Sequence, residues 1–124
     1  MITDNIKLTY VFDIDGTLCS LTNGKYENAT PFKNRIEVVN DLYYEGHTII
    51  LNTARGMGRT KNNQLLSNEM FREITENQLE SWGAKYTELS VGKKEHYDVW
   101  IDDKAFWSEN FFRQVYQDNT REDI

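Results

Sequence analysis

Apolar and polar residues along the chain follow two periods, one typical of buried strands and the other of amphipathic helices. Four short runs rich in β-branched and aromatic residues predict strands at residues 6–12, 47–52, 85–91 and 97–101. Apolar residues at helical spacing predict helices at residues 30–46, 62–71 and 76–82 and a short closing helix within 106–116. Thr30 and Pro31 have the residue types of an N-cap and a first helical residue, and Gly46 is a typical residue just past a helix end.

Two local signals refine this pattern. The run Thr75-Glu76-Asn77-Gln78 has the form of a capping box, which is why two helices are predicted on either side of it. Asn23-Gly24 is a strong signal for a two-residue hairpin turn, because both positions of a type I′ turn need a positive φ. We therefore expect a small β-hairpin flap made of residues 18–22 and 25–28, directly after the first strand.

The alternation of strands with helices predicts an α/β fold. The expected architecture is a doubly wound, Rossmann-like three-layer sandwich with a mainly parallel sheet. In such sheets the functional residues gather at the carboxyl ends of the strands.

Composition fits one domain in a reducing compartment. The 124 residues suit a single domain, residues 1–124, in which the polar stretch 117–124 reads as a frayed tail. A net charge of −6 disfavours a nucleic-acid partner. The single cysteine, Cys19, needs no oxidising environment. The first residues lack the basic and apolar regions expected of a signal peptide, and no apolar run reaches the length of a membrane span. We expect a cytoplasmic protein without a membrane partner.

The strongest candidate for chemistry is the acidic pair Asp13 and Asp15, which follows the first strand. Residues two apart on an extended chain point the same way, and Gly16 lets the chain turn directly afterwards. Two carboxylates at one edge repel each other unless a cation neutralises them. A site made only of oxygen ligands favours Mg²⁺ over Zn²⁺. Alone, such a pair is more often an ordinary acidic turn.

Other strand ends carry polar groups as well. Thr53 ends the second predicted strand, Asp102 and Asp103 end the last, and Lys93-Lys94 precedes that last strand. Each has an ordinary structural interpretation by itself, as a strand residue, a helix cap or a solvated charge. Their occurrence together, in order along one chain, is much less probable than any one of those interpretations.

With these residues in place, the chain resembles the haloacid dehalogenase-like (HAD) phosphohydrolase superfamily over residues 6–105. The matching runs are Asp13-Ile14-Asp15-Gly16-Thr17 after a hydrophobic strand, Ile49-Ile50-Leu51-Asn52-Thr53, Gly92-Lys93, and Val99-Trp100-Ile101-Asp102-Asp103. The runs Thr53-Ala54-Arg55-Gly56 and Ile101-Asp102-Asp103-Lys104-Ala105 look similar to small capless members associated with capsule or surface-polysaccharide biosynthesis.

The resemblance implies a role for each catalytic position. Asp13 would be the nucleophile that forms an aspartyl-phosphate, and Asp15 would protonate the leaving oxygen and then activate water. Thr53 would hydrogen-bond the phosphoryl oxygens, and Lys93 would neutralise their charge. Lys94 remains the alternative to Lys93, because the sequence does not resolve a register of one residue.

The resemblance also implies the metal and the substrate class. Mg²⁺ would be held by Asp13, by the main-chain carbonyl of Asp15, and by Asp102 or Asp103. The substrate would be a phosphorylated sugar, polyol or amino-alcohol group, free or attached to a larger saccharide. Short connections in place of a cap imply an open site, or a homo-oligomer whose neighbouring subunit covers it. The candidates for substrate contact are Arg55, Arg59, Lys25 and Tyr26.

Three alternatives stay open at this point. A polynucleotide end phosphatase fits an open site, but the net charge disfavours it. A receiver-like signalling domain uses similar residues, but there the phospho-accepting aspartate follows the acidic pair and the lysine comes last. Here Asp13 leads, and the Asp102–Asp103 pair follows Lys93. A non-catalytic binding module is disfavoured because every motif position keeps its reactive residue.

Overall fold

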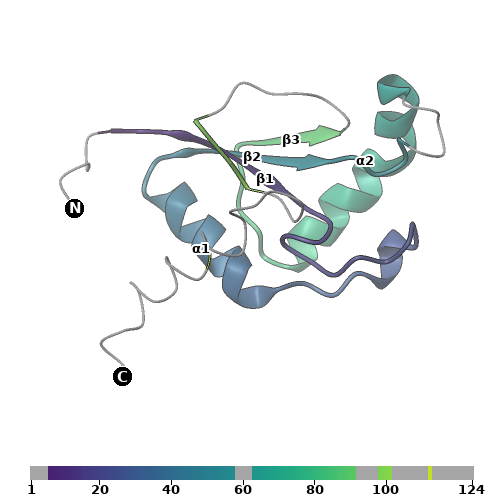
Figure 1. Cartoon of the computed structure of the whole chain (residues 1–124), viewed down its shortest axis with the longest axis horizontal. Helices are drawn as coiled ribbons and strands as arrows, with labels where there is room; N and C mark the ends of the chain where they lie inside the picture. Colours follow the sequence, from purple (N-terminus) through teal and green to yellow (C-terminus); the bar gives the residue numbers. More distant parts are fainter. Residues whose placement is uncertain (1–5, 58–62, 92–97, 102–111, 113–124) are drawn as a thin grey trace.

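A parallel sheet organises the part of the chain that this computed structural model describes, which is residues 6–57, 63–91, 98–101 and 112. Its strands have the order β3-β2-β1-β4, and Figure 1 labels the first three of them. Their bounds are Thr9–Asp13 for β1, Thr48–Thr53 for β2, Glu88–Val91 for β3 and Val99–Ile101 for β4. All pairings are parallel. The predicted α/β class and parallel sheet are confirmed, and each predicted strand is present with boundaries shifted by a few residues.

Two helices, α1 (Lys33–Tyr44) and α2 (Gln64–Ser81), pack against one face of the sheet. The parallel register places Phe12, Leu51 and Leu89 side by side on that face. These three side chains belong to the same buried cluster as Val39 of α1 and Leu79 of α2. Burial of these apolar side chains is the main favourable term that fixes the helices on the sheet.

The opposite face of the sheet is also apolar at its centre. Val11 and Ile50 are register partners there, and both are buried. The third layer of the predicted sandwich lies outside the described residues. So do the tail at 117–124 and the closing helix predicted within 106–116, apart from Phe112. The Phe112 ring lies 6.0 Å from that of Phe12, centroid to centroid, on the helix-covered face.

Helix α2 is continuous, so the prediction of two helices separated by a capping box at Thr75 is wrong. Its innermost positions are Ser67, Phe71, Thr75 and Leu79, which repeat every four residues and are all buried. Two of the four are hydroxyl residues, and this hid the buried stripe in the sequence. The helix begins instead after Asn63, whose side chain accepts a hydrogen bond from the backbone N–H of Leu66 at 3.0 Å.

The predicted flap forms its turn but not its hairpin. Asn23 and Gly24 both have positive φ, 56° and 88°, and the N–H of Lys25 donates to the carbonyl of Thr22 at 3.2 Å. The chain then winds into a short 3-10 helix, η1 (Tyr26–Asn28), and not into a second strand. The segment from Ser20 to Thr30 is therefore a closed loop, here called the flap loop. Two hydrogen bonds between Ser20 and Thr30 join its ends.

Helix α1 begins later than predicted. Pro31 pairs with Cys19 as an isolated antiparallel bridge, and the N–H of Phe32 donates to the carbonyl of Leu18 at 2.8 Å. These contacts keep the chain extended at Pro31, so Phe32 and not Thr30 is the N-cap. The other end agrees with the prediction, since the helix stops before Gly46, where φ is 98°.

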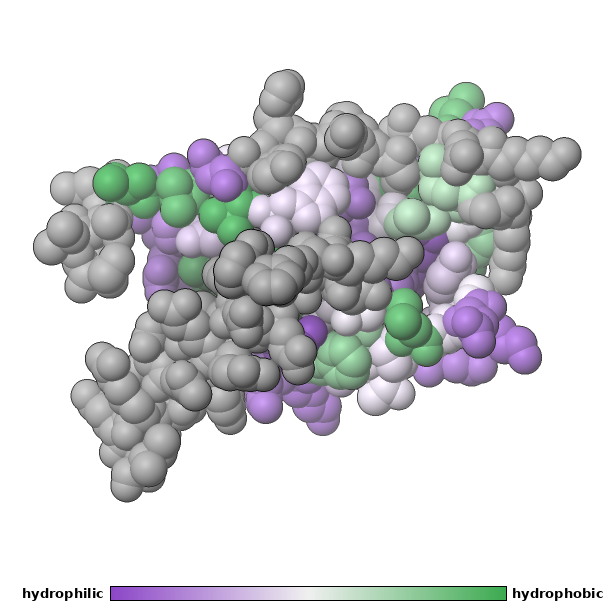
Figure 2. Space-filling model, viewed as in Figure 1, coloured by the Kyte–Doolittle hydropathy of each residue, from purple (hydrophilic) through white to green (hydrophobic). Residues whose placement is uncertain are grey.

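Three features concern possible caps and binding partners, namely the length of the connections, the helices and the surface. Residues 14–32 and 54–63, which join β1 to α1 and β2 to α2, are too short to form a cap domain. Neither helix has the length and apolarity needed to cross a bilayer, and this holds throughout the described part of the chain. Hydrophobic side chains on the face seen in Figure 2 are interspersed with polar ones. A groove of about 620 Å³ between α2 and β3 is lined by none of the predicted site residues.

Candidate active site

The carboxyl end of β1 turns sharply and presents two carboxylates. The carbonyl of Ile14 accepts hydrogen bonds from the backbone N–H groups of the three residues 17–19, which closes a tight turn. Gly16 lies in this turn with φ of 88°, a conformation that costs other residues strain. Asp13 is half-buried, and its Oδ2 accepts from the hydroxyl of Thr17 at 3.4 Å. The predicted acidic pair is thus positioned by the backbone of its own turn.

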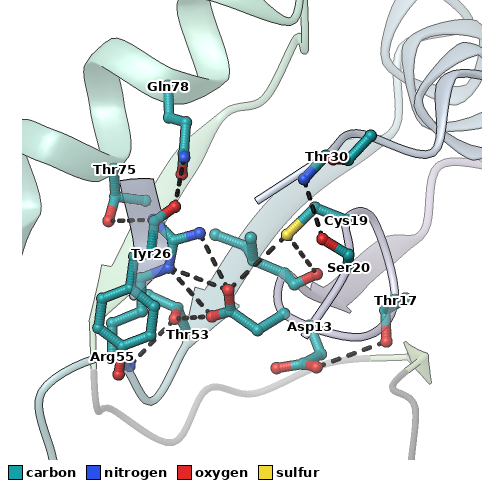
Figure 3. Close-up of polar contacts among 12 residues, drawn as sticks. Asp13, Thr17, Cys19, Ser20, Tyr26, Thr30, Thr53, Arg55, Thr75 and Gln78 are labelled. Atoms are coloured by element: carbon teal, nitrogen blue, oxygen red, sulfur yellow. Dashed lines mark hydrogen bonds and ion pairs between the residues drawn. The ribbon is translucent and has the colours of Figure 1, made fainter. Parts of the chain in front are cut away.

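Asp15 accepts hydrogen bonds from Thr53 at the end of β2 and from Arg55 in the loop that follows, and Figure 3 labels both donors. The Arg55 guanidinium donates through Nη2 to Oδ1 at 2.9 Å and through Nε to both carboxylate oxygens at 3.1 Å. The Thr53 hydroxyl donates to Oδ2 at 3.0 Å. Charge-assisted, two-point contacts of this kind are among the strongest hydrogen bonds in proteins. The Asp15 side chain keeps 19% of its surface exposed, so the carboxylate remains at the edge of the site.

Thr53 lies where the sequence predicted, at the carboxyl end of β2, but it is fully buried. Its hydroxyl donates to Asp15 and accepts from the backbone N–H of Arg55 at 3.1 Å. A hydroxyl has one proton to donate. The predicted hydrogen bond from Thr53 to a phosphoryl oxygen therefore requires the hydroxyl to rotate, so that it no longer donates to Asp15.

Arg55 does not lie where a substrate contact was predicted. Only 1% of the residue is exposed, and its side chain is enclosed. Besides the bonds to Asp15, Nη1 donates to the hydroxyl of Thr75 on α2 at 3.2 Å. The ring of Tyr26 covers the guanidinium, with Cζ 4.8 Å from the ring centroid. The expectation that Arg55 contacts substrate is corrected by its burial, which leaves a substrate no access to the guanidinium.

Tyr26 fastens the flap loop to the rest of the molecule. Its hydroxyl accepts from the backbone N–H of Gly56 at 3.2 Å, and its carbonyl accepts from the side-chain amide of Gln78 at 2.6 Å. Its ring also packs edge-on against Phe71 of α2, 5.3 Å between centroids. Tyr26, predicted to contact substrate, is half-buried between α2 and Arg55. Lys25, predicted for the same role, is exposed beside it.

Gly56 is required for this arrangement by both conformation and space. It has φ of 81°, and a Cβ added there would overlap the Phe71 ring. A side chain at this position would therefore push α2 away from the loop that carries Arg55.

Cys19 is buried behind Asp15. Its thiol lies 3.6 Å from the carbonyl of Ile14 and 3.7 Å from Oδ1 of Asp15. Burial, followed by the negative charge of Asp15, raises the pKa of Cys19 to about 12. The thiolate is the reactive form of cysteine, so this thiol has a packing role, as the sequence indicated.

We expect Cys19 to resist thiol reagents in the folded protein. At pH 8 a thiol with this pKa is ionised to only about one part in 10⁴, so Ellman's reagent should label the native protein far more slowly than the urea-unfolded protein. The folded-state pKa lies above the usual value near 9, so ionisation favours the unfolded chain. The thiol's contribution to stability is therefore lost as pH rises from about 9 to 12. Native labelling as fast as unfolded labelling would contradict this environment.

The described residues include two of the oxygen donors predicted for a magnesium ion. Asp13 supplies a carboxylate, and no hydrogen bond from the described residues ends on the main-chain carbonyl of Asp15. Both are hard oxygen donors of the kind that Mg²⁺ prefers, so they fit the predicted ion. They do not by themselves form a group of three acidic, histidine or cysteine ligands, and no such group exists among the described residues. The remaining predicted residues, namely Lys93, Lys94, Asp102, Asp103 and Arg59, lie outside the described part of the chain.

Sequence reasoning missed the residues of α2 that hold Arg55 and Tyr26. Thr75 was assigned to a capping box and Gln78 to the same motif, yet both side chains face the site from within one helix. One signal was available, because Thr75 lies four residues after Phe71 and four before Leu79, on the apolar stripe of a longer helix.

The fold and its site define an α/β protein with a parallel sheet and an acidic turn at the carboxyl end of its first strand. No family model matches the chain, and no curated protein is similar to it in sequence. A structural-genomics target from Vibrio cholerae is similar in structure, with a TM-score of 0.70 and 28% sequence identity, over 90% of this chain and 95% of that one. A conserved protein from Bacteroides thetaiotaomicron has a TM-score of 0.62 and 17% identity, over 94% and 92% of the two chains, and shares the fold.

Proposed function

We propose that the protein is a Mg²⁺-dependent phosphomonoester hydrolase that forms an aspartyl-phosphate on Asp13. The observation that carries the proposal is the convergence of three motif positions at one sheet edge. Asp13 ends β1, Asp15 follows it in a glycine-containing turn, and Thr53 at the end of β2 donates to Asp15 at 3.0 Å. The resemblance of the sequence motifs to HAD phosphohydrolases supports the same assignment.

In the first step Asp13 attacks phosphorus. A bond forms between a carboxylate oxygen and phosphorus, and the ester bond to the leaving oxygen breaks. Asp15, which would take up a proton from water before this step, gives that proton to the leaving oxygen. In the second step water attacks the aspartyl-phosphate and passes its proton to Asp15. The bond from phosphorus to Asp13 breaks, inorganic phosphate leaves, and both carboxyl groups return to their starting states.

The charge of the phosphoryl group must be balanced for a carboxylate to approach it. Mg²⁺, held by Asp13, the Asp15 carbonyl and Asp102 or Asp103, would supply that neutralisation. Lys93, or Lys94 in the alternative register, would add a positive charge at the same oxygens. Thr53 would turn its hydroxyl proton from Asp15 to a phosphoryl oxygen.

The proposed substrate is a phosphorylated sugar, polyol or amino-alcohol group used in capsular or surface-polysaccharide biosynthesis. The short connections around the site, without a cap, support a substrate that is bulky or attached to a larger saccharide. We further propose that the protein works in the cytoplasm, either alone or as a homo-oligomer whose neighbouring subunit covers the site.

Phosphate release from a substrate panel tests the proposal. The panel contains sugar, polyol, amino-alcohol and nucleotide phosphates together with a 3′- and a 5′-phosphorylated oligonucleotide, each assayed with Mg²⁺, with EDTA, and with Mg²⁺ restored. We expect release that disappears in EDTA and returns with Mg²⁺, fastest on a sugar or polyol phosphate. Preference for the oligonucleotides would favour a polynucleotide phosphatase. Absence of release from every ester would contradict the proposed hydrolase.

A further inference from the structure

Arg55 is the most completely enclosed charged side chain in the described part of the chain. Its residue is 1% exposed and its side chain 0%. A buried guanidinium is costly unless its charge is balanced and its donors are used. Here Asp15 balances the charge, and every described hydrogen bond of the guanidinium goes to Asp15 or Thr75. The ion pair therefore holds Asp15 and Arg55 in one defined geometry.

The contacts restrict Asp15 in both position and rotation. Nη2 and Nε together bind Oδ1, while Nε and the Thr53 hydroxyl bind Oδ2, so the plane of the carboxylate is fixed relative to the guanidinium. A monodentate ion pair would leave the carboxylate free to rotate about its last bond. The planar fork of arginine removes that freedom, which lysine cannot do.

Arg55 is itself fixed by two elements far away in the sequence. The Tyr26 ring of the flap loop lies over the guanidinium plane, and the Thr75 hydroxyl of α2 accepts from Nη1. Tyr26 is in turn held by Gly56 and Gln78. The position of Asp15 therefore depends on the docking of the flap loop and α2, whose residues Tyr26, Thr75 and Gln78 surround Arg55 in Figure 3.

We propose that Arg55 is a positioning residue that holds the Asp15 carboxyl for proton transfer, with Tyr26 and Thr75 holding the guanidinium. The inference rests on the proposed function and assigns Arg55 a role other than substrate binding. It predicts that loss of Arg55 impairs the proton transfer and leaves substrate affinity unchanged, because the enclosed guanidinium makes no contact with substrate.

Leaving-group dependence separates this role from a general structural one. A polyol alkoxide is a poor leaving group and needs a proton from a well-placed acid, whereas p-nitrophenolate leaves without one. A misplaced Asp15 should therefore slow cleavage of a polyol phosphate far more than cleavage of p-nitrophenyl phosphate. Damage to the whole site would slow both equally.

The experiment measures single-turnover cleavage and KM of full-length wild type, Arg55→Gln, Arg55→Lys and Thr75→Val, with a polyol phosphate and with p-nitrophenyl phosphate in Mg²⁺. For Arg55→Gln we expect a loss of about 10²-fold on the polyol phosphate, less than about 10-fold on the aryl phosphate, and an unchanged KM. Arg55→Lys and Thr75→Val should show the same selectivity, with a smaller loss for Thr75→Val. Arg72→Gln, which removes a partly exposed arginine paired with Glu76 on α2, is the matched control and should behave as wild type.

Each other outcome overturns the inference. Equal losses on both substrates would make Arg55 merely structural, a raised KM with unchanged turnover would make it a substrate contact, and unchanged rates would remove it from the reaction. If Arg55→Gln does not fold, Arg55→Lys and Thr75→Val decide by the same criterion. Failure of the proposed function itself is distinguishable, because wild type would then cleave neither ester.

Discussion

Replacing Asp13 by asparagine should reduce phosphate release by about 10⁴-fold or more while the protein stays folded. The amide has nearly the same shape as the carboxylate, and its oxygen can still accept from the Thr17 hydroxyl, now 3.4 Å away. It has neither the negative charge that would bind Mg²⁺ nor the nucleophilic oxygen that would attack phosphorus. The tight turn held by the Ile14 carbonyl does not depend on the charge of Asp13.

The measurement is phosphate release in Mg²⁺ for wild type and Asp13→Asn, with thermal unfolding of both. Asp98→Asn is the matched control, because Asp98 immediately precedes β4, at the opposite end of the strands from the acidic turn. The Asp98 carboxylate accepts from the backbone N–H of Thr9 at 2.7 Å, which an amide oxygen can also do. The control should keep wild-type activity. An Asp13→Asn protein with a tenth or more of wild-type release would show that Asp13 is not the nucleophile.

Replacing Asp15 by alanine should both stop turnover and destabilise the fold. Arg55 is fully enclosed, so its charge would be left buried without the carboxylate that balances it. Removing one partner of a buried pair costs about 3–5 kcal/mol, and we expect the lower end of that range because Asp15 keeps part of its surface in water. Asp15→Asn should be less destabilising, since its amide oxygen can still accept from the guanidinium, but its turnover should be at most slow.

A double-mutant cycle measures this coupling. Arg55→Met alone should cost less than Asp15→Ala, because the exposed edge of Asp15 can be hydrated. The double variant Asp15→Ala/Arg55→Met removes the charge imbalance. Its loss of unfolding free energy should be smaller than the sum of the two single losses by about 1–3 kcal/mol. Urea unfolding of the four proteins gives the four free energies. Additive losses would mean that the ion pair contributes nothing specific to the fold.

Local pattern predicted the centre of the sheet well because β1 and β2 contain nearly continuous apolar runs. Such runs bury both faces, and alternation with helices requires parallel pairing. The pattern failed on α2 because Ser67 and Thr75 occupy buried positions, so the innermost stripe of the helix is only half apolar. At the flap loop, the Asn23-Gly24 turn formed as its residue types require, while the contacts of Tyr26 replaced the second strand of the hairpin.

The site residues also divide into those that the sequence made recognisable and one that it did not. Asp13, Asp15 and Thr53 were recognisable because each follows an apolar strand, and strand ends of a parallel sheet meet at one edge. The roles predicted for these three residues, and for Lys93, Asp102 and Asp103, stay predictions. Arg55 was named only as a candidate for substrate contact, since an arginine in a glycine-containing loop is usually exposed.

The strands and the position of the acidic turn follow from residue periodicity, which acts over a few neighbouring residues, and the parallel pairing follows from the alternation of strands with helices. The partner of Arg55 was decided by packing, because Asp15 lies 40 residues away, Thr75 lies 20 residues away, and the Tyr26 ring comes from a third segment. Local propensity does not specify contacts between residues this far apart in the sequence. It exists because the fold must enclose a guanidinium, and an enclosed guanidinium is stable only where a carboxylate balances its charge.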